Sequence, residues 1–309
     1  MINITVTSFE TQPLNKRYIF AALIFNTVVC LCGNPFVIYI YSRKEFFKHS
    51  IFRYMTLSAV VDLLPILLIW MENYRSVFGL NTYFVGCKAF DFFKYLPNIF
   101  RHWILSCASI DRLISVKYPK NDEFRDKFQK FALSVVFISL CLINTPNVFV
   151  SNITSKGCAT TNFSLGAILA VFNAIIGNVV PGTVDLFCAC YIYYSLIRRK
   201  KKLREKFGNL KEKHDFNREV QFLKILVSLT IYFFVCTLPY CFTATYYLII
   251  GKPFRNTLII DLLLILANMH SSCDFFIHFF SNKLFQKRFI SLITCSRSIH
   301  LNNSTCRSF

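Results

Sequence analysis

The sequence predicts an all-α membrane protein: a bundle of seven transmembrane helices with an extracellular amino terminus and a short amphipathic helix after the seventh span. Apolar residues make up 54% of its 309 positions and charged residues 17%, whereas a soluble domain averages about 25% charged residues. Seven apolar runs are each long enough to cross a hydrocarbon core of about 30 Å as a helix. Because these runs are continuous, they argue against a β-barrel, whose strands alternate apolar and polar residues.

The chain divides into three parts. Residues 1–17 form a polar segment expected outside the cell, residues 18–280 the seven-transmembrane domain, and residues 281–309 a cytoplasmic tail. The first apolar run is too long for the core of a cleavable signal peptide. The expected spans are residues 18–41, 54–74, 88–116, 131–150, 166–197, 219–250 and 257–280.

The distribution of positive charge predicts the orientation of the chain. Loops on the amino-terminal side of the membrane hold 6 Lys and Arg residues, and those on the opposite side hold 25. By the positive-inside rule, the amino terminus is therefore outside. The net charge of +19 thus reflects topology, and we expect contact with membrane lipid rather than a nucleic acid partner.

Cysteines and glycosylation sequons agree with this orientation. Of the 13 cysteines, Cys87 and Cys158 are the two expected at the oxidising outer face, where a disulfide between them is favoured over two free thiols. The sequons at Asn3, Asn152 and Asn162 also fall on the outer side, so these three asparagines are predicted glycosylation sites.

The third span carries several ionisable residues. Lys94 and Arg101 lie within it, and Asp111-Arg112 marks its inner end. Charged side chains are costly in lipid and usually face the bundle interior or a cavity. We therefore expect this span to be surrounded by other helices.

Nothing in the sequence indicates an enzyme, a cofactor or a metal site. No Ser/His/Asp arrangement, phosphate-binding loop or metal-ligand cluster is present. His270, Asp274 and His278 recur every four residues in the seventh span. The two histidines would lie about 12 Å apart along a helix, which is too far to share one ion.

Short motifs occur in a fixed order along the spans. They are Gly33-Asn34, Leu57 to Asp62, Asp111-Arg112-Leu113, Pro146, Pro181, Phe233 to Tyr240, Asp274 to His278, and Phe285. In this order and spacing they resemble the LAxAD, DRY, FxxCWxPY and NPxxY motifs and helix prolines of rhodopsin-like (class A) G protein–coupled receptors. The 24 residues from Cys87 to Asp111 also match the spacing of that family.

The sequence departs from the resembled family at its switch positions. Leu113 replaces the tyrosine of DRY, Thr237 the toggle tryptophan, and Phe275 and His278 the proline and tyrosine of NPxxY. The segment from Ser272 to Phe285, with phenylalanine in place of proline, most resembles invertebrate neuropeptide receptors of the FMRFamide type.

The resemblance implies a multi-pass receptor of the plasma membrane that binds an extracellular ligand, expected to be a neuropeptide, and activates heterotrimeric G proteins. A chemosensory receptor for small external molecules is an alternative, because the tryptophan and the NPxxY motif are lost. A seven-span transporter is a more distant alternative, since such folds usually carry internal repeats, and none is seen here.

For signalling, the resemblance places Arg112 at the inner end of helix three, where it would meet the G protein. It implies a resting ionic lock in which Arg112 pairs with Asp111 and with Glu219 at the inner end of helix six. The alternative is that Arg112 is a solvated cation of the inner face.

Arg101 stands where members of the resembled family have a serine that lines a sodium pocket. The other residues of this internal polar core are Asn34, Asp62 and Asp274. We expect the guanidinium to bridge both carboxylates in place of the ion, because buried carboxylates need a cation and a planar fork of donors suits them. The alternative is that Arg101 snorkels away from the core.

The ligand pocket implied by the resemblance centres on Lys94. Amine receptors have an aspartate at this position, so we do not expect a monoamine ligand. Lys94 either binds an acidic or carbonyl-rich group of the ligand or pairs internally with Glu72 or Asp91. The other expected pocket residues are Asn98, Asn173, Tyr240, Thr243 and Tyr247.

Two features of the inner side complete the expectations. Residues 198–218 hold ten cations, which would contact anionic lipid, the G protein or both. Cys295 follows the amphipathic stretch from Leu284 to Ile293 and is a candidate palmitoylation site, with an unmodified cysteine equally expected.

Overall fold

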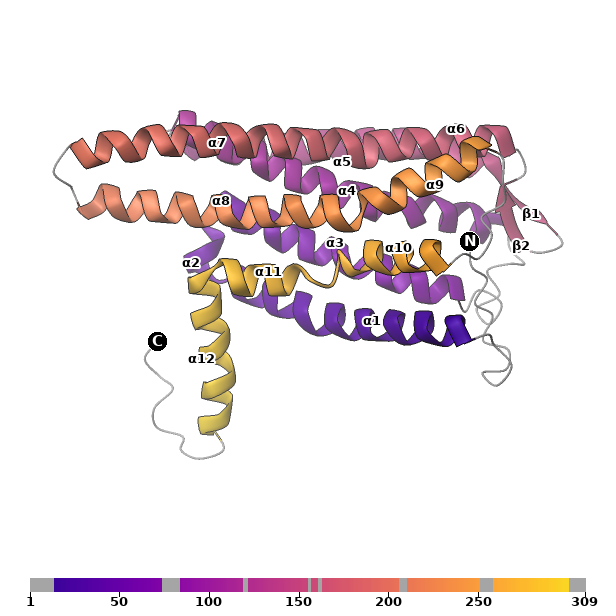
Figure 1. The fold of residues 1–309 in the computed structure, drawn as a ribbon, viewed down its shortest axis with the longest axis horizontal. Coiled ribbons are helices and arrows are strands. Elements are labelled where there is room, and N and C mark those ends of the chain that lie inside the picture. The colour runs from indigo at the N-terminus through magenta and orange to yellow at the C-terminus, as the bar shows by residue number, and fades with distance from the viewer. Residues whose placement is uncertain are drawn as a thin grey trace.

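In the computed structural model the chain forms an elongated bundle of helices (Figure 1). The structure describes residues 14–73, 84–118, 122–154, 157–160, 163–205, 210–250 and 258–299. The expected side chains of Glu72, Cys87, Asp91, Lys94 and Cys295, and the residues Asn3 and Asn162, lie outside what it describes.

The first four spans are single helices. They are α1 (Leu14–Tyr41), α3 (Ser50–Asn73), α4 (Phe84–Lys117) and α5 (Asp122–Val150), with the short α2 (Lys44–Phe47) between the first two. α1 begins four residues before the expected start of its span. After α5 the chain forms a small antiparallel hairpin that the sequence did not predict, β1 (Ser151–Thr154) and β2 (Gly157–Thr160).

The last three spans are each interrupted. The fifth consists of α6 (Phe163–Ala174), a π-helix (Ile175–Val179) and α7 (Val180–Glu205). The sixth is divided into α8 (Leu210–Cys236) and α9 (Leu238–Ile250), and the seventh into α10 (Leu258–Met269) and α11 (Asp274–Ser281). The expected amphipathic helix follows as α12 (Lys283–Ile299), which starts beside α11, away from the hairpin, and projects sideways from the bundle (Figure 1).

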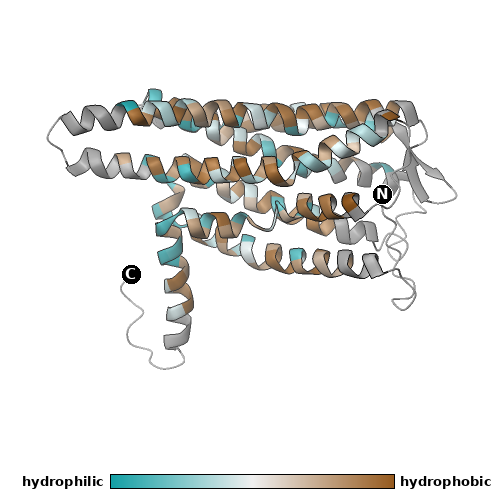
Figure 2. Ribbon diagram, in the orientation of Figure 1, coloured by the Kyte–Doolittle hydropathy of each residue, from teal (hydrophilic) through white to brown (hydrophobic). Residues whose placement is uncertain are grey.

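Five helical segments within the described residues are long and apolar enough to cross a membrane: Phe20–Tyr41, Ser50–Leu68, Glu123–Phe149, Ile168–Arg198 and Glu219–Tyr247. They correspond to the first, second, fourth, fifth and sixth expected spans. The third expected span, α4, carries ionisable residues along its length, and the seventh is divided into helices of 12 and 8 residues. Hydrophobic residues predominate along the length of the bundle (Figure 2).

α4 is the central helix of the bundle. It contacts α3, α5, α7, the π-helix and β1. At the π-helix, the indole Nε1 of Trp103 donates a hydrogen bond of 3.0 Å to the carbonyl oxygen of Ile176. The π-helix also brings Gly177 against Ile99, so closely that a Cβ on the glycine would lie 2.8 Å from Cγ1 of Ile99.

The main hydrophobic core lies in the half of the bundle nearest α2 and α12. It is built from α1, α2, α3, α4, α8 and α12, and its members include Tyr41, Phe52, Ile104, Leu226 and Phe285, none more than 4% exposed. On either side of this core along its axis, α4 has charged side chains that contact neighbouring helices. Those charges form the candidate site.

Candidate functional site: a buried charge network on α4

Arg101, in the middle of α4, contacts two carboxylates from two other spans. Its Nε lies 2.6 Å from Oδ1 of Asp62 on α3, and its Nη2 lies 2.8 Å from Oδ2 of Asp274 at the start of α11. All three side chains are at most 4% exposed. The side chain of Arg101 is thus directed into the bundle, and it does not snorkel.

The same guanidinium also binds the break in helix seven. Nη2 of Arg101 donates a hydrogen bond of 3.2 Å to the carbonyl oxygen of His270, and Nη1 contacts the imidazole Nδ1 of His270. His270 directly follows the last residue of α10, and Asp274 is the first residue of α11. A cation therefore lies at the carboxyl end of one helix and an anion at the amino end of the next, the arrangement that helix dipoles favour.

This cluster has more acidic than basic groups, because two carboxylates face one guanidinium. Oδ2 of Asp62 and Oδ1 of Asp274 have no hydrogen-bond partner among the described residues. Asn34, expected in the same layer, is 1% exposed and donates to the carbonyl oxygen of Ser271 at 3.3 Å. It therefore stabilises the helix-seven break beside the cluster instead of binding the carboxylates.

An aromatic group joins this cluster to helix six. The ring of Tyr232 on α8 stacks on His270 with centroids 5.4 Å apart, and its hydroxyl donates to the carbonyl oxygen of Met269 at 3.0 Å. His102 lies 4.5 Å from the ring centre of Phe233, also on α8. Sequence reasoning missed these contacts, although two histidines inside apolar runs were a signal that could have indicated them.

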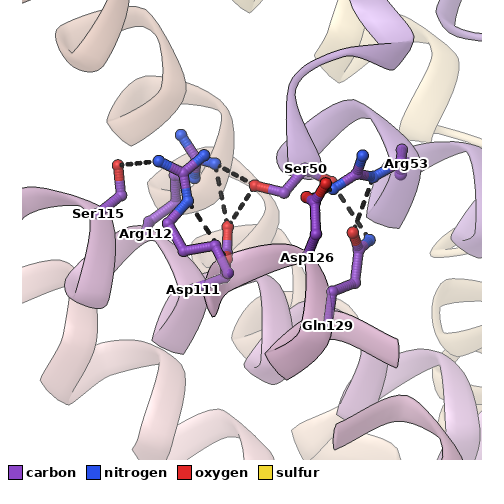
Figure 3. Close-up of polar contacts among 8 residues, drawn as sticks. Ser50, Arg53, Asp111, Arg112, Ser115, Asp126 and Gln129 are labelled. Atoms are coloured by element: carbon purple, nitrogen blue, oxygen red, sulfur yellow. Dashed lines mark hydrogen bonds and ion pairs between the residues drawn. The ribbon is translucent and has the colours of Figure 1, made fainter. Parts of the chain in front are cut away.

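The inner end of α4 holds a second charge cluster (Figure 3). Arg112 Nη2 lies 3.0 Å from Oδ2 of Asp111 and also donates to the hydroxyl of Ser50 at the start of α3. That hydroxyl donates to the same Asp111 oxygen at 2.5 Å. Asp111 is fully buried and Arg112 is 3% exposed, so Arg112 is not a solvated surface cation.

Neighbouring pairs extend this cluster to α5. Arg53 on α3 binds the carboxylate of Asp126 and donates to the amide oxygen of Gln129 at 2.8 Å (Figure 3). Arg125 donates to the hydroxyl of Ser115 at 3.5 Å. The inner ends of α3, α4 and α5 are thus joined by polar contacts that the sequence did not predict.

The predicted contact between Arg112 and Glu219 is wrong for this structure. No ion pair joins them, although both residues are within the described part of the chain. The donors of Arg112 are directed toward Ser50 and Asp111, and the ring of Phe222, one turn beyond Glu219, lies 5.1 Å from the guanidinium carbon. An aromatic side chain of α8 therefore takes the place expected for the carboxylate.

The altered switch positions also have specific contacts. Thr237 lies between α8 and α9, at the break of helix six. Phe275 packs so closely on Gly33 that a Cβ on the glycine would lie 2.8 Å from Cβ of Phe275. His278, in the place of the NPxxY tyrosine, is 1% exposed and lies edge-on to Tyr41 with centroids 5.2 Å apart.

The outer residues are described only in part. Asn98 is exposed, whereas Asn173, Tyr240, Thr243 and Tyr247 are half-buried. The hydroxyl of Thr243 donates to the carbonyl oxygen of Pro239 within its own helix. Asn152 lies in β1, and Cys158 in β2 pairs with Ile153. In the described residues no three His, Cys, Asp or Glu side chains come together as metal ligands.

The bundle and its internal charges define a multi-pass α-helical protein of the plasma membrane. The chain belongs to the rhodopsin family of seven-transmembrane receptors, because the family model described as "7 transmembrane receptor (rhodopsin family)" matches residues 33–277. This is a family of receptors and not of enzymes.

Individual relatives are distant but extend over most of the chain. It is 23% identical to the human protein named probable G-protein coupled receptor 174, over 93% of this chain and 90% of that protein. It is 22% identical to C-X-C chemokine receptor type 4-B of Xenopus laevis, over 78% of this chain and 67% of that receptor. It is 21% identical to galanin receptor 2b of Danio rerio, over 93% of this chain and 78% of that receptor.

Proposed function

We propose that this protein is a receptor that binds an extracellular peptide and in response activates heterotrimeric G proteins. The observation that carries the proposal is the buried pair of Asp111 and Arg112 at the inner end of α4. A buried arginine without solvent is costly unless it is paired, and such intramembrane charges are usually functional. Here Arg112 is the residue that a rearrangement of the inner helices would expose to a G protein.

A two-state bundle would connect an outer ligand to this inner end. A ligand shifts such an equilibrium only by its difference in affinity for the two states. α4 is suited to this because it contacts four other helical segments and carries charges at its middle and its inner end. Arg101 serves as a built-in internal cation that joins helices two, three and seven.

Two considerations favour a peptide ligand. Two of the relatives are by name receptors for a chemokine and for galanin. The second is the expectation, from the sequence of Ser272 to Phe285 alone, of a likeness to neuropeptide receptors of the FMRFamide type. In this proposal Lys94 provides the cation for an acidic or carbonyl-rich group of the peptide. The other pocket residues are Asn98, Asn173, Tyr240, Thr243 and Tyr247. The alternative is that Lys94 pairs internally with Glu72 or Asp91.

Further expectations follow for covalent modification. Contacts between β1 and α4 support a disulfide between Cys158 on the hairpin and Cys87 on α4. Asn3, Asn152 and Asn162 are proposed to carry glycans on the outer side. Cys295, near the end of α12, is the proposed palmitoylation site.

The proposal is tested by screening peptides on cells that express the full chain with a promiscuous G protein. A dose-dependent response to a peptide, without its uptake, supports the proposal. Arg112→Gln should abolish the response but keep binding of the labelled peptide. A response only to small non-peptide molecules would instead favour a chemosensory receptor, and accumulation of ligand in the cell without a response would favour a transporter.

A further inference from the structure

We propose that Phe222 on α8, and not Glu219, holds the inner half of helix six against Arg112 in the resting receptor. The contact is a cation–π interaction between the guanidinium and the phenyl ring. This inference rests on the proposed function, and it specifies how the same inner site is regulated.

Three partners surround the guanidinium of Arg112. Ser50 and Asp111 accept hydrogen bonds from Nη2, and both are themselves buried. The Phe222 ring centre lies 5.1 Å from the guanidinium carbon. This separation is within the range at which a cation is attracted to the face of an aromatic ring. Of these three partners, Phe222 is the one on helix six.

Phe222 also contacts helix two through its ring. Its centroid is 5.4 Å from that of Phe52 on α3 and 6.2 Å from that of His49, which lies just before α3, and Phe222 is 4% exposed. The side chain thus lies between α3 and α4 while it belongs to α8. Outward movement of α8 would withdraw the ring from both helices together and would uncover Arg112.

The environment of Arg112 favours the contact with Phe222 over a pair with Glu219. Cation–π interactions are strongest where the cation is desolvated, and Arg112 is 3% exposed. Glu219 lies one turn farther toward the inner end of α8 and is half-buried. A carboxylate in contact with water gains little from pairing, because water screens the charges.

The test uses the full-length receptor without any ligand and two readouts. The first is basal nucleotide exchange on a G protein in membranes. The second is hydrogen–deuterium exchange of the α8 backbone over residues 216–229 in purified receptor, which does not depend on a G protein. Phe222→Leu should shift the resting equilibrium and raise both readouts roughly 5- to 30-fold, the factor that about 1 to 2 kcal/mol represents.

Matched variants separate the ring from other causes. Phe222→Tyr keeps an aromatic face and should behave as wild type, and Glu219→Gln should leave both readouts unchanged. Phe216→Leu, on the same helix but packed against Ile192, Leu196 and Leu223, is the control for loss of a phenyl ring. If the leucine variant does not fold, ring-fluorinated phenylalanines at position 222 should raise exchange stepwise with each fluorine, since fluorine weakens the negative ring face while largely keeping its shape.

The outcomes are distinct. Deuterium exchange that is equal in Phe222→Leu and Phe216→Leu, or flat across the fluorinated series, overturns the inference. If both readouts rise in Glu219→Gln and in no other variant, Glu219 and not Phe222 is the partner of Arg112, and the inference is overturned. In a further outcome, deuterium exchange follows the expected order of variants but no variant promotes nucleotide exchange. That result supports the aromatic contact and counts against the proposed function.

Discussion

Arg101 Nε lies 2.6 Å from Oδ1 of Asp62, and their side chains are 2% and 0% exposed. Arg101 also binds Asp274 at 2.8 Å, so a single guanidinium connects α3, α4 and α11. Side chains that share one buried cation depend on one another. Removing the cation should therefore affect three spans at once.

Arg101→Met should destabilise the receptor by about 3–5 kcal/mol, because it leaves two buried carboxylates without a cation. The triple variant with Asp62→Asn and Asp274→Asn should recover most of this loss, since no unpaired charge is then buried. The measurement is thermal unfolding of purified receptor in detergent. Lys127→Met, whose side chain and partner Glu123 are 77% and 82% exposed, is the control and should cost no more than about 1 kcal/mol. Equal losses in the single and triple variants would contradict the charge argument.

Sodium should have no specific effect on the wild-type receptor. Both carboxylates that would bind the ion already contact Arg101, so replacing sodium chloride by choline chloride at equal ionic strength should leave the melting temperature unchanged. Arg101→Ser removes the internal cation and should make the melting temperature depend on sodium. A wild-type receptor that sodium stabilises strongly would show that Arg101 does not replace the ion.

Tyr232→Phe should loosen the connection between helices six and seven. The variant keeps the ring on His270 but removes the hydrogen bond to the Met269 carbonyl. That carbonyl still accepts hydrogen bonds from the backbone N–H groups of Ser272 and Cys273, so the loss of one bond should cost about 0.5–1.5 kcal/mol. The expected result is a lower melting temperature. Tyr193→Phe, at a position 60% exposed, is the control and should be nearly neutral.

Gly177→Ala should destabilise the π-helix by about 1–3 kcal/mol, the usual cost of overpacking. The added methyl group would meet Ile99 on α4 at 2.8 Å. In a double-mutant cycle, Gly177→Ala should cost less in the Ile99→Ala background, because the smaller side chain leaves room. Additive losses would show that the glycine is required for another reason.

Sequence patterns predicted the seven spans well because membrane-spanning helices need long apolar runs. The motif positions also led to the grouping of Arg101, Asp62 and Asp274, since two acids in neighbouring spans imply a buried cation. The hairpin β1–β2 could not be predicted in the same way, because its strands are four residues each. Such short segments give little alternation from which to infer a strand.

The inner contacts show where sequence reasoning reached its limit. Family spacing pointed to Glu219 as the partner of Arg112, but spacing along one helix does not give the rotation of that helix against its neighbours. The ring of Phe222, one turn away, meets the guanidinium instead. The role of Ser50 could not be predicted either, since nothing in the sequence indicates that a serine at the start of a span binds a distant arginine and aspartate.

The break in helix seven is stabilised by side chains from other helices. Its residues 270–273 turn without the proline that the NPxxY pattern provides, and Phe275 has the backbone N–H that a proline lacks. A proline would prescribe the bend in every state of the protein. Here side chains of other helices bind the carbonyl groups of the break: Arg101 donates to that of His270, Asn34 to that of Ser271 and Tyr232 to that of Met269. The break of helix seven is therefore a property of the packed bundle, and a change in helix packing can alter it without any change within helix seven itself.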